Sequence, residues 1–195
     1  MRKKVLITDG NSRAALAITR SLGKRGYEVH VSAVADISLA GRSKYCHQAH
    51  TYPDPTANRD RFVNAIEDLV RELKVDILLP VTDICLLPIV GQLERLQSIC
   101  SVPFSSRATL ERAASKEEIT QLARDLGVAT PQSRTLAGKG QSDCTEWGGL
   151  FPVVIKPSRS RVRDGDGWLY TGVDYAHTQD ELDKKLLALP GTAYP

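Results

Sequence analysis

The sequence lacks a strong charge of either sign. Its 26 lysines and arginines face 23 aspartates and glutamates, which leaves a formal net charge of +3 at pH 7. Because proteins that hold nucleic acid usually present a strongly basic face, this balance argues against a nucleic-acid partner. The basic residues gather locally instead, which favours a site for a small anionic ligand.

Long apolar runs and paired cysteines are also missing. The first apolar run, residues 5–7, is far shorter than a signal peptide or a membrane span requires. The four cysteines lie far apart with no CxxC pair, and His47 and His50 have no second ligand pair nearby, which disfavours a zinc site. We expect a cytoplasmic protein with free thiols, no membrane partner and no metal ligands in this chain.

The first part of the chain alternates short apolar runs with amphipathic stretches. The apolar runs predict strands at residues 4–8, 27–33, 49–52, 76–80 and 99–102. Helical spacing predicts helices at 12–24, 58–73 and 84–96, the last broken at Pro88. A strand–helix–strand opening implies a parallel sheet with helices on both faces. We therefore predict an α/β fold over residues 1–114, a Rossmann-like, doubly wound parallel sheet.

The pattern changes after Pro103 and predicts a second, smaller α+β unit over residues 115–195. Ser115 and Glu118 have the spacing of a capping box, and the helix that they open ends at Gly127. Strands are expected at 132–136, 153–156 and 168–173, with an arginine-bearing loop joining the last two and a helix after Thr178. The tail at 189–195 looks like the lead-in to another strand, so we expect a longer protein that continues past Pro195.

A polar turn follows the first predicted strand, in the sequence TDGNSRAA at residues 8–15. It keeps the turn glycine of a dinucleotide fingerprint as Gly10, but Ser12 replaces the middle glycine and no acidic residue ends the second strand. An NAD-dependent oxidoreductase is therefore the weakest alternative. Gly10, Asn11, Ser12 and Arg13 either face a substrate at the carboxyl edge of the sheet or only cap a helix.

A second polar turn, LLPVTD at residues 78–83, ends a predicted strand at the same carboxyl edge. Open α/β sheets bind ligands at this edge, so Thr82 and Asp83 are substrate-side candidates. Asp83 can orient an amine or hydroxyl, and it can equally cap the helix that begins at Ile84.

Two lysines stand at positions where an anion would stabilise them. Lys116 opens a helix, where the helix dipole disfavours a positive charge by about 0.3–1 kcal/mol. Glu117 and Glu118 beside it offer a purely local explanation. Lys156 ends the apolar strand in FPVVIKP, whose two faces are expected to be covered, so its ammonium requires a partner anion.

The ordered run of a helix opening on Ser-Lys, then LGVATP, then FPVVIKP, then a polar loop with glycines resembles the ATP-grasp superfamily. The resemblance is to its carbamoyl-phosphate-synthase-like and carboxylate–amine ligase members. It implies a pre-ATP-grasp domain followed by a linker helix and a lid subdomain. It also implies that Lys116, Lys156 and the lid loop residues Ser158, Arg159, Ser160 and Arg161 bind the phosphates of ATP.

This loop departs from the family pattern. Arg159, Arg161 and Arg163 stand where the family uses glycine and serine, and only Gly165 and Gly167 remain. Arginine forks can replace backbone amides as phosphate ligands, or they can bind an acidic substrate or a partner protein. The resemblance implies Mg2+ as a second cofactor, with its ligands in a C-terminal domain that this chain lacks.

The resemblance implies an N-terminal fragment of a ligase that activates a carboxylate as an acyl phosphate for attack by an amine or similar nucleophile. The partners would be small-molecule carboxylate and amine-type substrates, and a homodimer remains open. Without the metal ligands, we expect the chain alone to bind ATP weakly and to be inactive. The alternative is a non-catalytic module that senses a nucleotide or an acidic metabolite.

Overall fold

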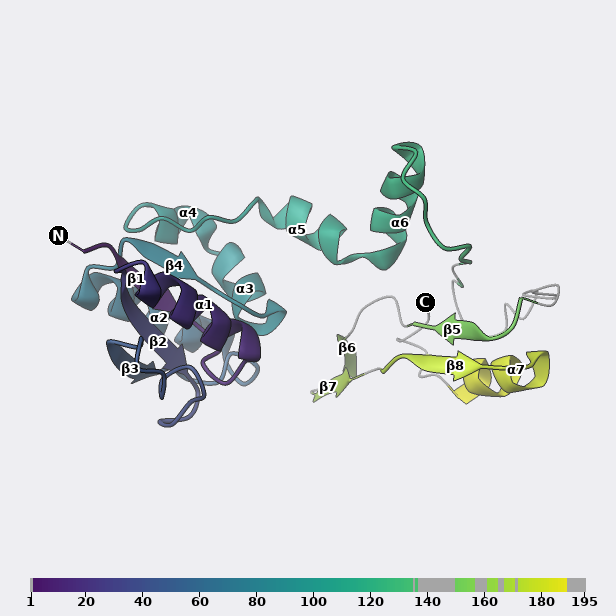
Figure 1. The fold of residues 1–195 in the computed structure, drawn as a ribbon, viewed down its shortest axis with the longest axis horizontal. Helices are drawn as coiled ribbons and strands as arrows, with labels where there is room; N and C mark the ends of the chain where they lie inside the picture. The colour runs from purple at the N-terminus through teal and green to yellow at the C-terminus, as the bar shows by residue number, and fades with distance from the viewer. Residues whose placement is uncertain are drawn as a thin grey trace. The chain divides into compact units, whose positions relative to one another are not determined.

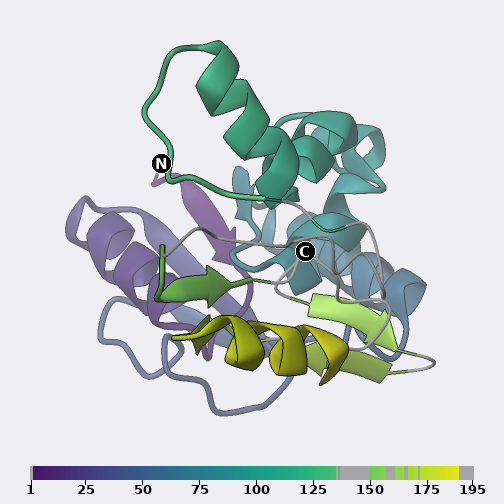
Figure 2. The same ribbon diagram turned by 90° about the vertical axis from the view of Figure 1, so that its right-hand side faces the viewer.

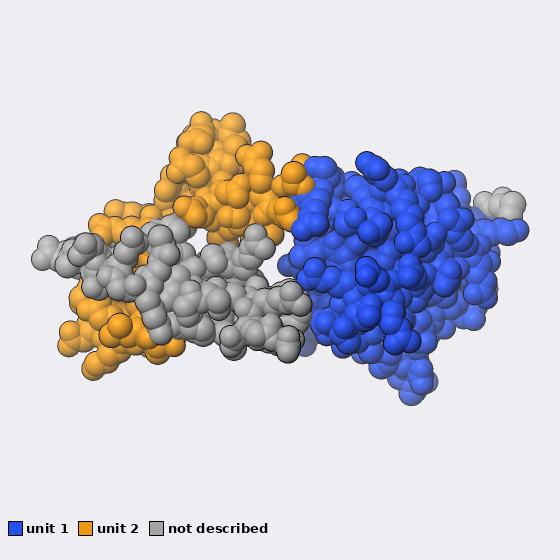
Figure 3. All heavy atoms as spheres, turned by 180° about the vertical axis from the view of Figure 1, so that it is seen from behind, with its two compact units in different colours: residues 1–107 blue, residues 108–195 orange. Residues whose placement is uncertain are grey.

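The computed structural model describes residues 2–134, 136, 150–156, 161–164, 167–170 and 172–188, and of residues 161–164 and 167–170 it describes the backbone only. The chain separates into two compact units, Met1–Arg107 and Ala108–Pro195 (Figure 3). Each unit is treated by itself below. Among the described residues, no helix combines the length and the apolar character that crossing a bilayer demands.

The first unit is built on a four-stranded parallel sheet in the order β3-β2-β1-β4. Its strands are β1 (Lys4–Ile7), β2 (Glu28–Ala33), β3 (Gln48–Thr51) and β4 (Ile77–Leu79). This confirms the predicted α/β fold with a Rossmann-like parallel sheet. The expected strand at 99–102 is reduced to one parallel bridge between Ile77 and Ser101, because Pro103 brings no backbone N–H to extend the pairing.

Side-chain alternation along the strands divides the first unit into three layers. Val5, Ile7, Val29 and Val31 point to one face, where α1 (Arg13–Lys24) covers them with Ala15, Leu16, Ile18 and Leu22. Leu6 and Leu78 point to the other face, into a cluster with residues of α2 (Arg59–Leu73), which include Phe62, Ile66 and Val70. Helices therefore lie on both faces of the sheet (Figure 1).

The helical segment after β4 does not break where the sequence predicts. Helix α3 (Asp83–Val90) passes through Pro88, and the chain turns at Gly91 before the short α4 (Leu93–Gln97). Pro88 has no N–H to donate to the carbonyl of Ile84, four residues earlier, so it removes one hydrogen bond of this short helix without ending it. The break is therefore three residues later than expected.

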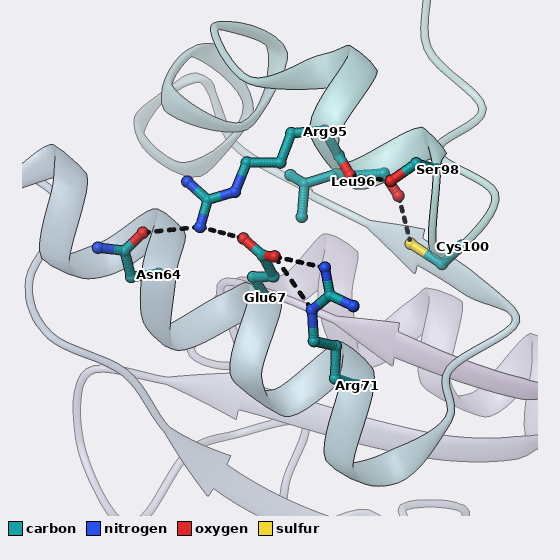
Figure 4. A network of polar contacts seen from close by, with 7 residues as sticks. All are labelled: Asn64, Glu67, Arg71, Arg95, Leu96, Ser98 and Cys100. Atoms are coloured by element: carbon teal, nitrogen blue, oxygen red, sulfur yellow. Dashed lines mark hydrogen bonds and ion pairs between the residues drawn. The ribbon is translucent and has the colours of Figure 1, made fainter.

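A buried carboxylate joins α2 to α4. Glu67, which is 7% exposed, accepts two hydrogen bonds from Arg71, from Nε at 3.0 Å and from Nη2 at 2.8 Å. Arg95 forms an ion pair with the same carboxylate and donates to Asn64 Oδ1 at 3.1 Å (Figure 4). These donors, with Arg71 first, hold the pKa of Glu67 below its usual value in spite of burial.

We expect Glu67→Gln to destabilise the first unit by about 1–3 kcal/mol at pH 7, because charge-assisted hydrogen bonds are replaced by weaker ones. The range is modest because the side chains of Arg71 and Arg95 are about half exposed. The folded pKa is lowered, so this stability is present above the ordinary value of 4.5 and is lost as pH falls through the folded value. Urea unfolding of both proteins from pH 7 to pH 3 should show the difference shrinking.

The matched control for this prediction is Asp68→Asn on the same helix, since Asp68 is exposed. It should change the stability little at any pH. A wild-type advantage over Glu67→Gln that stays constant down to pH 3 would contradict the proposed role of the carboxylate.

The second unit begins within α5 (Arg107–Ala114), and two helices and four strands follow it in the described residues. Helix α6 (Lys116–Asp125) is followed by β5 (Val153–Ile155), β6 (Arg161–Asp164), β7 (Gly167–Tyr170), β8 (Asp174–Ala176) and α7 (Gln179–Ala188). β5 pairs with β8 and β6 pairs with β7, both antiparallel. Helix α7 packs on the β5–β8 pair through Leu182 and Leu186 (Figure 2).

Strand pairing in the second unit differs from the expectation. The sequence predicts that the strands near 153–156 and 168–173 are joined by a loop of arginines, but the arginine segment itself forms β6, which pairs with β7. The strand partner of β5 is β8, a segment that the sequence analysis left unassigned. The expected strand at 132–136 is also absent from its described residues 132–134 and 136. The β5–β8 pair joins separated segments, and local apolar patterns do not report such pairing.

Candidate functional site

Asp9 is the polar centre of the carboxyl edge of the sheet in the first unit. It follows β1 directly and has φ of 58°, a left-handed conformation that is uncommon for a residue with a side chain. Aspartate tolerates this conformation better than most residues. A residue held there requires tertiary contacts that fix it, and such positions gather at functional sites.

The Asp9 carboxylate ties the turn after β1 to the turn after β4. Oδ2 accepts from Thr8 Oγ1 at 2.6 Å, from Val81 N at 3.2 Å and from Thr82 N at 3.1 Å. Oδ1 accepts from Thr82 Oγ1 at 2.6 Å. With four donors, the carboxylate is close to saturated, so its role is to fix the two turns rather than to bind a substrate directly.

Two buried side chains continue this network into the core. The backbone N–H of Asp9 donates to the Tyr52 hydroxyl at 3.1 Å, and this hydroxyl lies 3.3 Å from Cys85 Sγ. Burial raises the pKa of Tyr52 far above its usual value and raises the pKa of the Cys85 thiol to about 12. Both groups are therefore neutral at ordinary pH, and Cys85 is not a nucleophile.

The sequence analysis selected the four residues after Asp9 as substrate-side candidates. In the structure, three of them, Gly10, Asn11 and Ser12, make contacts within the first unit. Gly10 lies against Ser38, where a Cβ would stand 2.6 Å from the Ser38 hydroxyl oxygen. Its N–H donates to Ser32 O at 3.0 Å, and the Asn11 side chain accepts from Leu39 N at 3.1 Å. Ser12 caps α1 through Ala15 N at 2.9 Å. Of the four, Arg13 alone is an exposed charged group at this turn.

This arrangement bears on the NAD alternative. The N–H groups of Gly10 and Ser12 are taken by Ser32 O and Asp9 O, at 3.0 and 2.7 Å. A pyrophosphate bound as in a dinucleotide fingerprint needs such amides to point outward. The turn therefore gives that alternative no support from its geometry.

In the second candidate turn, Thr82 makes a contact within the first unit and Asp83 is exposed. Thr82, and not Asp83, is the N-cap residue of α3, but its hydroxyl is used by Asp9 and makes no cap bond. The interpretation of Asp83 as the cap is therefore wrong. Asp83 is the first helical residue, and its side chain is exposed at the carboxyl edge. Asp83 and Arg13 are thus exposed charged groups at this edge.

The second unit contains a cleft of about 850 Å³ between α6, the segment that follows it, β5 and α7. Lys116 and Lys156 both line it, which brings together two residues that are forty positions apart in the sequence. Its apolar wall includes Ile119, Leu136, Val154, Leu182 and Leu186. A cleft with paired ammonium groups beside an apolar wall suits a ligand that has an anionic end and a flat apolar end.

The positive charge of Lys156 affects the pKa of Lys116. Desolvation lowers the pKa of Lys116 first, and the positive charge of Lys156 lowers it further. Two like charges in one cleft raise the energy of the unliganded state, and a bound polyanion relieves that repulsion. The predicted cap of α6 contributes to the geometry, because Ser115 Oγ accepts from Glu118 N at 3.2 Å. The Glu118 carboxylate lies 3.3 Å from Arg112 Nε instead of completing a capping box.

The remaining predicted phosphate ligands lie largely outside the described residues. Ser158, Arg159 and Ser160 fall there, and Arg161 is described only as the first backbone residue of β6. Their roles stay predictions. Among the described residues, no cluster of histidine, cysteine, aspartate or glutamate has the arrangement of a metal site.

The comparison with curated proteins found a relative among amino-acid ligases. Residues of this chain are 30% identical to the D-alanine–D-alanine ligase of Aquifex aeolicus over 101 residues, which are 51% of this chain and 32% of that ligase. The matched part therefore spans about a third of the relative's length. No family model matches the chain.

Solved structures of ATP-grasp proteins share the fold. The L-amino acid ligase of Bacillus licheniformis matches with a TM-score of 0.66 and 15% identity, over 95% of this chain and 41% of that one. The N5-carboxyaminoimidazole ribonucleotide synthetase of Thermotoga maritima matches with a TM-score of 0.62 and 23% identity, over 97% and 44%. The predicted resemblance to the ATP-grasp superfamily is confirmed, and it concerns the N-terminal portion of these proteins.

Proposed function

Since the chain has the fold of the N-terminal portion of ATP-grasp proteins, we propose that it supplies the pre-ATP-grasp domain and part of the nucleotide site of an ATP-dependent ligase. The observation that carries this proposal is the pairing of Lys116 and Lys156 in one cleft. The relative named above is a ligase for D-alanine, which supports a carboxylate and an amine as the substrate classes.

In the proposed complex, the two ammonium groups bind phosphate oxygens of ATP, and the apolar wall with Ile119 and Val154 contacts the base. A bound polyphosphate would cancel the repulsion between the lysines, so the pKa of Lys116 would rise again on binding. Mg2+ neutralises the polyphosphate in such reactions, but the described residues offer no set of ligands for it. The resemblance to ATP-grasp ligases is the reason to propose that its ligands lie in a C-terminal domain.

The proposed reaction has two steps. A carboxylate oxygen of the first substrate attacks the γ-phosphorus of ATP. The bond between the γ-phosphorus and the oxygen that bridges it to the β-phosphate breaks, so that ADP departs and an acyl phosphate is formed. The amine nitrogen of the second substrate then attacks the acyl carbon, the C–O bond to phosphate breaks, and the nitrogen loses a proton. Asp83 is a proposed substrate-side contact of the first unit, because its carboxylate is exposed at the edge where α/β sheets hold ligands.

The test is ATP binding to the protein as its gene encodes it, measured by isothermal titration calorimetry. Lys156→Ala should weaken binding by at least tenfold, since it removes a charge-assisted phosphate contact from the cleft. Lys184→Ala, an exposed lysine of α7, is the matched control and should leave the affinity unchanged. Equal affinities of the wild type and Lys156→Ala would overturn the proposal.

The alternative of a nucleotide or acidic-metabolite sensor predicts the same loss of binding but a different chemistry. A ligase that follows these two steps forms ADP repeatedly only when its carboxylate and amine substrates are both supplied. A sensor binds ATP and releases it unchanged. Measuring ADP formation with a panel of amino acids separates these two outcomes.

A further inference from the structure

The first unit has a second cleft, of about 330 Å³, at the edge of the sheet opposite to Asp9. Here β1 and β2 begin, and the segment at 44–47 leads into β3. The side chains that give it chemical character are Arg2, Tyr27, Lys44, Tyr45 and His47. None of these residues belongs to the candidate sites described above, and the N-terminus lies at this end of β1 (Figure 1).

The positive charge of this cleft is not cancelled by the one carboxylate that lines it. Glu28 is already paired, with Lys4 Nζ at 3.3 Å, with His30 Nε2 at 3.2 Å and, at the longer distance of 4.0 Å, with His47 Nε2. The hydrogen bond from His30 is the main reason that the pKa of Glu28 lies below its usual value. In the described part of the chain, no ion pair engages Arg2 or Lys44, so two full positive charges remain for an external anion.

The sequence builds this cleft through close packing and not through chance exposure. Gly23 at the end of α1 lets Tyr45 approach, because a Cβ there would stand 2.5 Å from Tyr45 Cβ. The segment is fixed by Cys46 N donating to Ser43 O at 2.9 Å and His47 N donating to Val29 O at 2.7 Å. Lys44 Nζ then lies 5.3 Å from the centre of the Tyr45 ring, a cation–π distance that limits where the ammonium can go.

We propose that this cleft binds a small phosphomonoester. A terminal phosphate has three oxygens, and donor side chains from two segments line the cleft: the Arg2 guanidinium from one, and the Lys44 ammonium and the His47 imidazole from the other. The volume of about 330 Å³ suits a sugar phosphate and is small for a nucleoside triphosphate. Tyr27 and Tyr45 line the remaining wall, where they provide ring faces and hydroxyls for the organic part of the ligand.

This site is independent of the proposed ligase reaction, since it lies on the first unit at the edge away from Asp9 and Asp83. The lining of this cleft contains none of the substrate candidates at the carboxyl edge, so the ligand is not expected to be consumed. A site of this kind adds a binding activity to the protein whether or not the ATP cleft is functional.

The experiment is an NMR titration of the 15N-labelled chain with inorganic phosphate and with ribose 5-phosphate, at constant ionic strength set by chloride. It uses Lys156→Ala as the background, so that phosphate binding in the second unit does not contribute. Saturable shifts are expected for the amides of Lys44, Tyr45 and His47, with ribose 5-phosphate binding at least threefold tighter than inorganic phosphate.

Two variants decide the assignment. Arg2→Gln and Lys44→Gln should each raise the dissociation constant about tenfold, because each removes one charged contact. Lys24→Gln, a basic residue in the last turn of α1 that does not line the cleft, should leave it unchanged. Linear shifts without saturation, or the same loss in Lys24→Gln as in Lys44→Gln, would overturn the proposal, because either result is expected of general attraction to a basic surface.

Discussion

Replacing Asp9 with alanine is expected to lower the free energy of unfolding of the first unit by about 2–4 kcal/mol, because it leaves several partly buried donors without their acceptor. Oδ1 and Oδ2 together accept from two backbone N–H groups and two threonine hydroxyls, at 2.6–3.2 Å. The left-handed φ adds to the loss, since alanine tolerates that conformation less well than aspartate.

Asp9→Asn is the matched variant for this prediction. Asparagine keeps an acceptor oxygen and tolerates the left-handed conformation, but its NH2 group replaces either Oδ1, which accepts from one donor, or Oδ2, which accepts from three. We expect a loss of about half that of alanine. Both tryptophans, Trp147 and Trp168, belong to the second unit, so intrinsic tryptophan fluorescence does not follow this change. Hydrogen exchange of the β1 and β4 amides reports the loss of stability in the first unit.

The expected pattern is faster exchange across β1 and β4 in Asp9→Ala than in Asp9→Asn, with both above the wild type. Amide exchange rates give the free energy of unfolding of this unit. If that free energy differed by less than about 0.5 kcal/mol between the alanine variant and the wild type, the network would be dispensable. That result would also remove Asp9 from the candidate site.

Phe62→Ala is expected to cost about 3–5 kcal/mol, because Phe62 is fully buried at the centre of the α2 side of the core. The aromatic ring meets the ring of Tyr52 edge-on, with centroids 4.9 Å apart. Truncation therefore removes apolar contact and also frees the ring whose hydroxyl accepts the Asp9 N–H. The core defect should reach the carboxyl edge.

Phe62→Leu keeps most of the volume and should cost less than about 1.5 kcal/mol. Urea unfolding followed by far-UV circular dichroism gives both values. Hydrogen exchange at Asp9 then distinguishes a local cavity from a loosened site. Equal losses in the alanine and leucine variants would show that the volume at this position does not control the stability.

Much of the fold could be predicted from the sequence because its signals are local. The apolar runs of β1, β2 and β4 and the amphipathic pattern of α2 lie within single segments, and their alternation with helices implies the parallel sheet. The two lysines were also singled out from the sequence, since each stands at a position where an anion would stabilise it. The structure places Lys116 and Lys156 in the same cleft.

The Asp9 network was not predictable from local patterns. Its partners Val81 and Thr82 are 72 and 73 residues away, and no sequence pattern near Asp9 predicts these contacts. One signal was present, because an aspartate before glycine at a strand end is a residue that adopts left-handed geometry. The pairing of β5 with β8 was missed for the same reason, since it joins segments that are separated in the sequence.

The arrangement of the sheet has a consequence for self-association. The outer strand β3 spans only Gln48–Thr51, and it presents glutamine, histidine and threonine to its surroundings. At the other margin, Ser101 N donates to Asp76 O at 2.8 Å, and its carbonyl accepts from Leu78 N at 2.9 Å, so the outer side of β4 is partly occupied. Short, polar or covered margins resist the addition of a strand from another molecule. Self-association by extending the four-stranded sheet is therefore not expected.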